Sequence, residues 1–102
     1  MNIAKLMKQA QKVQSDVARV QEEVARLERS FSVGGGAVTA VATGDGKVKQ
    51  VKIAPTLLNP AEVDMLEDMV LSAVNGALED VRKEANERLS AVTAGLNLPG
   101  LM

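Results

Sequence analysis

The chain of 102 residues lacks histidine, cysteine, tryptophan and tyrosine, and it contains a single phenylalanine. Without histidine and cysteine it has no thiol nucleophile, no imidazole ligand for a metal and no side chain that ordinarily titrates near neutral pH. The adjacent carboxylates Glu67 and Asp68 point to different sides of a helix and give no basis for acid catalysis. We therefore expect no enzyme, no cofactor and no small-molecule substrate.

Long hydrophobic runs are also lacking. No apolar stretch approaches the ~18 residues of a membrane span, and the first residues alternate lysine with apolar side chains, unlike a signal peptide. The absence of cysteine is compatible with a reducing compartment. We expect a cytoplasmic chain without a membrane partner.

The first thirty residues carry apolar side chains at alternating steps of three and four, a heptad pattern. This period is typical of a long helix whose apolar stripe packs against another helix. We expect a helix from about Asn2, its N-cap, to Ser30, which is longer than a globule of about 100 residues is wide. We therefore expect an elongated chain that completes its core by oligomerising. The stripe consists of Ile3, Leu6, Ala10, Val13, Val17, Val20, Val24, Leu27 and Phe31.

Three glycines at 34–36 interrupt the helical pattern, and the period then changes to two. Residues 37–43 alternate small and β-branched side chains, which is typical of a strand. Asp45-Gly46 predicts that this strand turns back as a hairpin through a type I′ turn. The pattern leaves open whether residues 31–33 form a third short strand. The sequence thus predicts a hairpin or a three-stranded meander.

Two registers of the hairpin are open. A two-residue turn gathers the apolar residues on one face by pairing Ala40 with Val51 and Val38 with Ile53. A loop one residue longer pairs Val51 with Thr39 instead. Because an isolated hairpin is marginal in water and its free edge invites pairing, we expect a symmetric homodimer that joins the sheets. The four apolar residues of the first register are the predicted dimer interface.

A second helix is predicted from Asn59 to the residue before Gly95. Asn59 is a suitable N-cap, Pro60 suits the first helical position, and Glu62 completes a variant of the capping box. Gly95 is expected to end the helix in the left-handed conformation, so that residues 1–95 form one domain and residues 96–102 a flexible tail. The apolar positions of this helix are Val63, Leu66, Val70, Val74, Ala77 or Leu78, Val81, Ala85, Leu89 and Val92.

The charges are segregated along the chain, although the net charge is only −1. Residues 1–31 carry six basic and four acidic side chains, whereas residues 59–94 carry three basic and eight acidic ones. Most basic side chains have a carboxylate at a favourable helical spacing, as Arg88 has in Glu84, so a solvated helix face accounts for them.

Lys5 and Lys8 have no local carboxylate, since no acidic residue precedes Asp16, and Lys12 has only Asp16, in the weaker orientation. They crowd the N-terminal part of a helix, where the macrodipole disfavours cations. Local stability does not select this arrangement, so we infer an external anion such as the phosphates of a duplex. The candidate DNA-binding residues are Lys5, Lys8, Lys12, Arg19, Lys83 and Arg88.

Several short segments, in order along the chain, have a distinctive sequence. They are Leu6-Met7-Lys8-Gln9-Ala10-Gln11, the glycine run before the hairpin, Val51-Lys52-Ile53 followed by Pro55, Met65-Leu66-Glu67-Asp68, and Leu98-Pro99-Gly100. Together they resemble the YbaB/EbfC nucleoid-associated proteins over nearly the whole chain.

This resemblance implies an α+β fold, a long helix, a hairpin or meander and a second long helix, in a tweezer-shaped homodimer with its sheets joined at the centre. It also implies a bacterial cytoplasmic protein that binds double-stranded DNA and helps to organise the nucleoid or regulate genes. Only Lys5 and Lys8 lie in a segment that matches the family; contacts by the other basic residues rest on charge alone. Because lysines dominate and no aromatic side chain is available to stack on bases, we expect largely sequence-tolerant binding.

An alternative is a coiled-coil chaperone or adaptor with an architecture similar to prefoldin subunits. Apolar residues near both chain ends would then hold client chains. They are Ile3, Leu6, Met7, Leu96 and Leu98.

Overall fold

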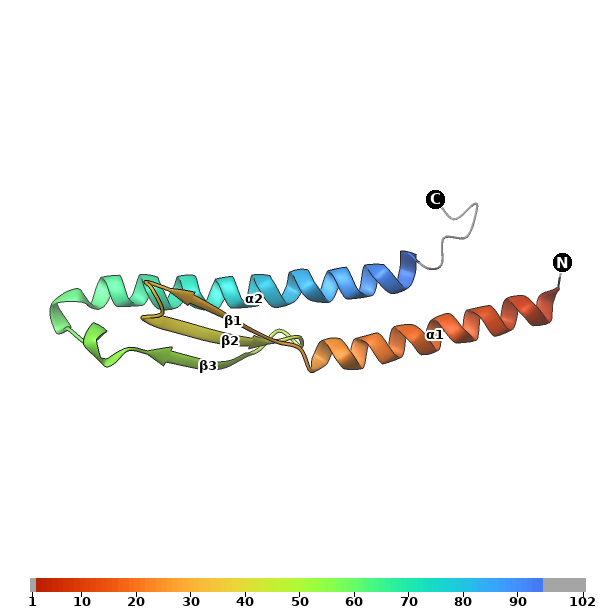
Figure 1. Cartoon of the computed structure of the whole chain (residues 1–102), viewed down its shortest axis with the longest axis horizontal. Helices are drawn as coiled ribbons and strands as arrows, with labels where there is room; N and C mark the ends of the chain where they lie inside the picture. The colour runs from red at the N-terminus through yellow and green to blue at the C-terminus, as the bar shows by residue number, and fades with distance from the viewer. Residues whose placement is uncertain (1, 95–102) are drawn as a thin grey trace.

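The computed structural model describes residues 2–94, which form a long helix, a three-stranded antiparallel sheet and a second long helix (Figure 1). The strands lie in the order β1-β2-β3, so the sheet is a simple meander. This arrangement confirms the predicted α+β fold class. The elements are α1 (Ile3–Ala25), β1 (Glu28–Val33), β2 (Val38–Thr43), β3 (Val48–Ile53), 3-10 turns at Pro55–Leu57 and Pro60–Glu62, and α2 (Val63–Ala94).

Helix α2 covers one face of the sheet and then continues past it beside α1 (Figure 1). The chain measures 72 × 23 × 16 Å and has a radius of gyration of 20.2 Å. A compact chain of this length would have a radius of gyration of about 13 Å. The elongated shape expected from the heptad stripe is therefore confirmed, and α1 projects from the end of the sheet as an arm.

Helix α1 is shorter than predicted. Asn2 is its N-cap as expected, since its side-chain oxygen accepts a hydrogen bond from the Lys5 amide at 3.2 Å. The helix ends at Ala25, however, so the prediction that it reaches Ser30 is wrong. Leu27 and Phe31 continue the heptad spacing although both lie beyond the helix. Leu27 is buried just after it, and Phe31 points from β1 toward α2.

The open question of a third strand is resolved by β1, which is longer than the expected segment at 31–33. A third strand protects one edge of β2 and gives the sheet more pairing than a hairpin alone. The three glycines at 34–36 have φ values of 63°, 67° and 93°. They form the turn between β1 and β2 rather than a break between helix and hairpin.

A β-bulge reconciles the two hairpin registers. Near the turn, the Thr43 amide donates to the Lys47 carbonyl at 2.8 Å, which closes a loop of three residues. The ladder then shifts between Val41 and Ala42, and farther from the turn Ala40 pairs with Val51. The predicted pairing of the apolar residues is confirmed. The type I′ turn is wrong, because only Gly46 of the loop has a positive φ, of 84°.

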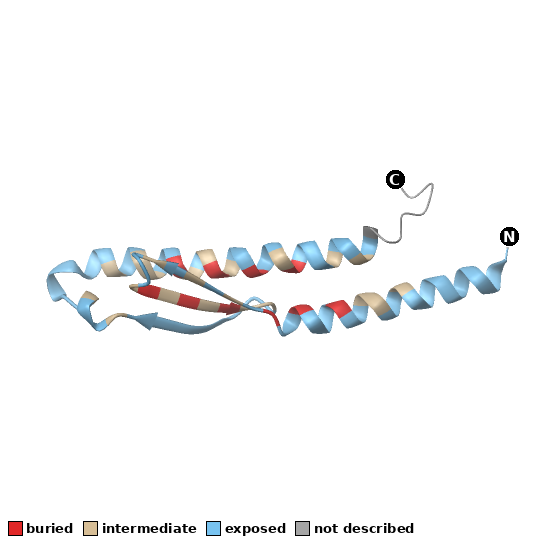
Figure 2. Ribbon diagram, in the orientation of Figure 1, coloured by how far each residue is buried: buried red, intermediate tan, exposed pale blue. Residues whose placement is uncertain are grey.

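The core consists of small side chains (Figure 2). One stripe of α2, at four-residue spacing, is buried, and so are alternate residues of β2 and the C-terminal part of the α1 stripe. Small residues at these positions let the helix backbone approach the sheet closely. The predicted apolar positions of α2 omitted Ala73, which is buried, and included Val63, which is exposed. The buried residues are Val20, Val24, Leu27, Val38, Ala40, Ala42, Ala73, Ala77, Val81 and Ala85.

The start of α2 differs in detail from the prediction. The Asn59 side chain accepts a hydrogen bond from the Ala61 amide at 3.0 Å, but it caps the 3-10 turn Pro60–Glu62, and the α-helix begins at Val63. The α-helix extends to Ala94 as expected. The predicted terminator Gly95 and the tail at 96–102 lie outside the described residues.

Gly44 holds the hairpin against the end of α1, and its amide donates to the Leu27 carbonyl at 2.9 Å. A Cβ at this position would overlap the carbonyl oxygen of Val24, which is backbone and cannot rotate away. We expect Gly44→Ala to lower the free energy of unfolding by about 3 kcal/mol, measured by chemical denaturation. Gly46→Asn is the control, since a Cβ there meets open space and Asn tolerates a positive φ. Equal losses in both variants would contradict the close contact.

Candidate nucleic-acid interface

The N-terminal half of α1 carries three exposed lysines on a face separate from its apolar stripe. Lys5, Lys8 and Lys12 follow one another at steps of three and four, so they line one side of the helix. Within residues 2–94, no ion pair involves any of them. The arm therefore presents three cationic groups to solvent, as the sequence predicted.

Arg19 lies on the same helix but is already paired. Its guanidinium lies 3.8 Å from the Asp16 carboxylate and donates a hydrogen bond of 3.1 Å to Glu23. These pairs are exposed and weak, so they would yield to a phosphate. Arg19 can add to the lysine surface, but its positive charge is partly compensated within the helix.

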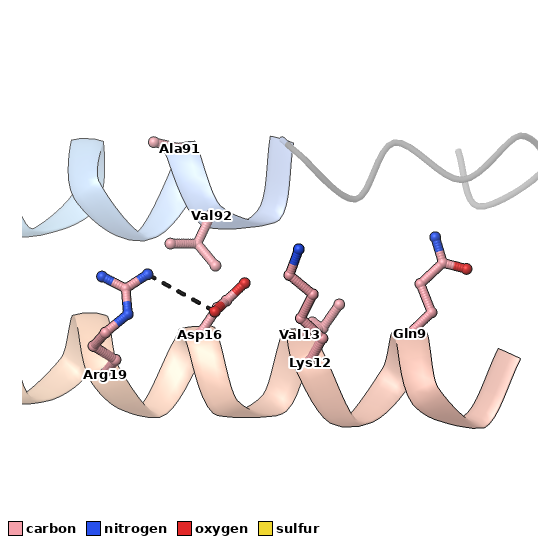
Figure 3. Close-up of a pocket in the computed structure, with 7 residues that line it drawn as sticks. All are labelled: Gln9, Lys12, Val13, Asp16, Arg19, Ala91 and Val92. Atoms are coloured by element: carbon pink, nitrogen blue, oxygen red, sulfur yellow. Dashed lines mark ion pairs between the residues drawn. The ribbon is translucent and has the colours of Figure 1, made fainter. Parts of the chain in front are cut away.

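A shallow groove lies where the last turns of α2 pass the middle of α1 (Figure 3). The side chains of Lys12 and Arg19 extend along this groove from α1, with Asp16 between them, and Val92 points into it from α2 (Figure 3). The groove has two cations and one anion among its lining residues. Its full lining is Gln9, Lys12, Val13, Asp16, Arg19, Ala91 and Val92.

The two basic candidates on α2 lie in a different environment. Arg88 donates to Glu84 at 3.3 Å, and Glu84 also pairs with Arg29 of β1. Lys83 lines a hollow beside these residues that also contains Asp80 and Glu87. The structure therefore does not bring Lys83 and Arg88 together with the arm lysines, and each lies among carboxylates.

The ion pair of Arg29 with Glu84 was missed by the sequence analysis, which placed Arg29 in a helix. It joins β1 to α2 across 55 residues of chain, and no local spacing signals such a contact. The pair of Lys49 with Glu28 joins β3 to β1 and was missed for the same reason. Both pairs neutralise basic residues near the sheet, whereas the three arm lysines take part in none of the ion pairs within residues 2–94.

The four residues of the predicted dimer interface separate into two pairs. Val38 and Ala40 are fully buried beneath α2 in the same chain, so they are part of its own core and are not accessible to a partner. Val51 and Ile53 remain 40% and 37% exposed on β3. The strand that carries them has an unpaired edge in the sheet.

Other chemistry has little support in the described part of the chain. No three Asp or Glu side chains among residues 2–94 gather as metal ligands do, and none of its helices could span a membrane. The pKa of Asp45 is lowered, first because the Thr43 hydroxyl donates a hydrogen bond to its carboxylate. This contact lies in the β2–β3 turn and stabilises the loop rather than a site.

Comparison with solved structures defines the class of the fold. The chain superposes on the crystal structure of an uncharacterized protein from Helicobacter pylori with a TM-score of 0.70, covering 92% of this chain and 98% of that one. The sequences are 19% identical, so this likeness establishes the fold alone. The class is an α+β protein in which two long helices flank a three-stranded meander.

The sequence comparisons establish the family. Residues 1–96 match the profile of the YbaB/EbfC DNA-binding family. A nucleoid-associated protein of Clostridium botulinum strain Hall is 46% identical over 100 residues, which cover 98% of this chain and 88% of the relative. A nucleoid-associated protein of Ruminiclostridium cellulolyticum is 45% identical with the same coverage. The chain belongs to the YbaB/EbfC family, which is a DNA-binding family and not an enzyme family.

The structure predicts that Glu84 stabilises the fold through its two arginines. We expect Glu84→Gln to lower the free energy of unfolding by about 1 kcal/mol, because the partly buried ion pairs to β1 and within α2 are both lost. Chemical denaturation with added salt measures this, and salt should reduce the difference. Glu87→Gln is the matched control, since Glu87 is exposed and takes no part in these pairs. A loss of the same size in the control would contradict the assignment.

Proposed function

We propose that this protein is a homodimeric, largely sequence-tolerant binder of double-stranded DNA in the bacterial nucleoid, within the cytoplasm. On this proposal it helps to organise the chromosome and to regulate gene expression. The observation that carries the proposal is the arm of α1, whose three lysines have no ion pair within residues 2–94. Membership in a DNA-binding family supports the same partner.

Phosphate contacts supply most of the proposed affinity. Lys5 and Lys12 are separated by about 10 Å along the helix axis, which is the axial length of about three phosphates on one strand of a duplex. The N-terminal end of α1 adds its free amides and positive dipole, which also favour phosphate. Lys12 and Arg19 then continue the basic surface toward the groove beside α2. Contacts of these groups to phosphates carry no base information, which accounts for the proposed sequence tolerance.

A second copy is the proposed partner of the exposed apolar strip beside α2. Val51 and Ile53 pair across the ladder with two residues buried under α2, so they face the same side of the sheet. Along the neighbouring flank of α2, apolar side chains that are only half-buried recur at four-residue spacing: Val70, Val74 and Leu78. Joining two chains at β3 would pair the free edge and cover both apolar rows.

Dimerisation explains how a chain of net charge −1 binds DNA. Two chains related by a twofold axis present two arms and therefore two sets of three lysines. The affinity of one weak arm is raised by the second arm, which binds at a high effective concentration. The proposed dimer thus binds DNA more tightly than the small cationic surface of one chain would.

We expect replacement of Lys5, Lys8 and Lys12 by Ala to weaken binding to a random duplex of about 40 base pairs by at least about tenfold at low salt. The slope of log K against log salt should decrease by about 0.9 for each phosphate contact that is lost. A salt series followed by fluorescence anisotropy measures both quantities.

The control replaces Lys47, Lys49 and Lys52, which lie on the hairpin, and changes the net charge equally. It should bind nearly as tightly as the unaltered protein, with an unchanged slope. If the two triple variants bind equally well, the arm is not the DNA-binding surface.

The double variant Val51→Lys/Ile53→Lys should be a folded monomer, because four charges would be buried at the proposed interface. Sedimentation velocity gives the mass, and circular dichroism confirms the helices. Gln50→Lys is the control, since Gln50 pairs with Val41 on the opposite face and its variant should stay dimeric. A dimer that survives the double substitution would rule out β3 as the interface.

A further inference from the structure

A second groove, which we call the β1 groove, lies between β1 and the N-terminal half of α2. The ring of Phe31 lies against Gly76, where a side chain would overlap it. Leu71, which is 60% exposed, lines the groove together with Ser72 and Asn75 of the same helix. The β1 groove therefore presents part of an aromatic ring and a leucine side chain to solvent.

Two carboxylates also line the β1 groove, one toward each end of its α2 side. Asp68 and Glu79 are exposed, and neither takes part in an ion pair within residues 2–94. Their separation along the axis of α2 is about 16 Å. A carboxylate beside an aromatic ring suits a lysine, because its carbon chain packs on the ring while its ammonium group meets the anion.

The arm of α1 carries the complementary groups. Lys5, Lys8 and Lys12 lie on one side of the helix over about 10 Å, and none has an ion pair within residues 2–94. Because lysine side chains are long and flexible, Lys5 and Lys12 can reach outward to the more widely spaced carboxylates. The two surfaces therefore match in charge and nearly match in length.

The arm cannot reach the β1 groove of its own chain. Ala91 and Val92, in the C-terminal turns of α2, lie beside Gln9 and Val13 of α1. Glu79, the nearer carboxylate, lies about 20 Å back along α2 from Val92. The N-terminal turns of α1 lie farther still from the sheet (Figure 1). A contact between the arm lysines and the β1 groove therefore requires a second copy of the chain.

We propose that the arm of one copy docks in the β1 groove of another copy. The arm lysines pair with Asp68 and Glu79, and their carbon chains pack on Phe31. Strands β1 and β3 are opposite edges of the sheet, so this contact leaves the proposed dimer interface at β3 free. It joins the arm of one copy to the sheet of the next, a head-to-tail contact that can propagate. This inference does not depend on DNA binding.

The distribution of charge favours a second copy as the partner. Residues 59–94 carry eight acidic and three basic side chains, whereas residues 1–12 carry three basic side chains and no acidic one. Each copy therefore brings both halves of the contact. Because the contact is small and its charges are exposed, the association is weak and decreases with salt.

Charge reversal tests the contact by mixing two variants. Lys5→Glu/Lys12→Glu has an acidic arm, and Asp68→Lys/Glu79→Lys has a basic groove. Neither variant should associate with itself beyond the dimer. In an equal mixture at a salt concentration of about 0.02 M, the two should associate at least about tenfold more tightly than either does alone. Sedimentation velocity measures the association, and circular dichroism confirms that each variant is folded.

The control places two lysines on α2 outside the β1 groove. Asp64→Lys/Glu87→Lys changes the net charge by the same amount as the groove variant, and both positions are exposed. Its mixture with Lys5→Glu/Lys12→Glu should associate at least about tenfold more weakly than the first mixture. Equal association in the two mixtures would show attraction by net charge alone and would overturn the proposal. A first mixture that does not associate would overturn it as well.

Neutralising the two carboxylates gives a second measurement with less change to the protein. Asp68→Asn/Glu79→Gln should associate beyond the dimer at least about fivefold more weakly than the unaltered protein at low salt. Asp64→Asn/Glu87→Gln, which removes the same charge outside the β1 groove, should associate as the unaltered protein does. Equal association in the two neutral variants would contradict the proposal. No DNA is present in these experiments, so their outcome is independent of the test of DNA binding by the arm.

Discussion

The close packing of one stripe of α2 is the contact on which the rest of the structure depends. The N-terminal half of this 32-residue helix covers the sheet, and its C-terminal half lies beside α1. Small side chains, with Ala73, Ala77 and Ala85 buried, permit the close approach that a core almost without aromatic residues needs. Gly76 extends this principle, since a side chain there would overlap the ring of Phe31. The single phenylalanine is thus fitted to a glycine on the facing helix.

Helix α2 cannot cover both the whole sheet and the whole of α1. The apolar surfaces that it leaves exposed are available for binding. It covers β1 and β2 closely but contacts β3 little, which leaves Val51 and Ile53 beside a free edge. Its described part, which extends to Ala94, also leaves the N-terminal turns of α1 exposed. Both gaps expose apolar side chains, and burying each stabilises the molecule through the same hydrophobic effect that forms the core. A second chain at β3 is the proposed way to cover the first of them.

Much of this architecture could be predicted because it depends on local patterns in the sequence. The heptad stripe, the Asn2 cap, the alternation of β2 and the pairing of Ala40 with Val51 follow from spacing within short windows. The errors lie where tertiary contacts decide. Glu28 and Arg29 look like helix surface, yet each makes an ion pair with a residue distant in sequence. Likewise, nothing in the hairpin itself shows that α2 buries Val38 and Ala40 but leaves their partners on β3 accessible.

The separation of charge between the two helices favours one surface of the molecule, the arm, for the proposed DNA binding. Residues 59–94 carry eight carboxylates and would repel a polyanion from the body of the molecule, while the arm lysines attract it. If the positive charge were spread evenly, DNA would approach any face, including the β3 edge that a partner must reach. Pairing Arg29 and Lys49 with carboxylates near the sheet removes cations from that region. On the proposed function, these ion pairs lower the attraction of the sheet for DNA relative to that of the arm.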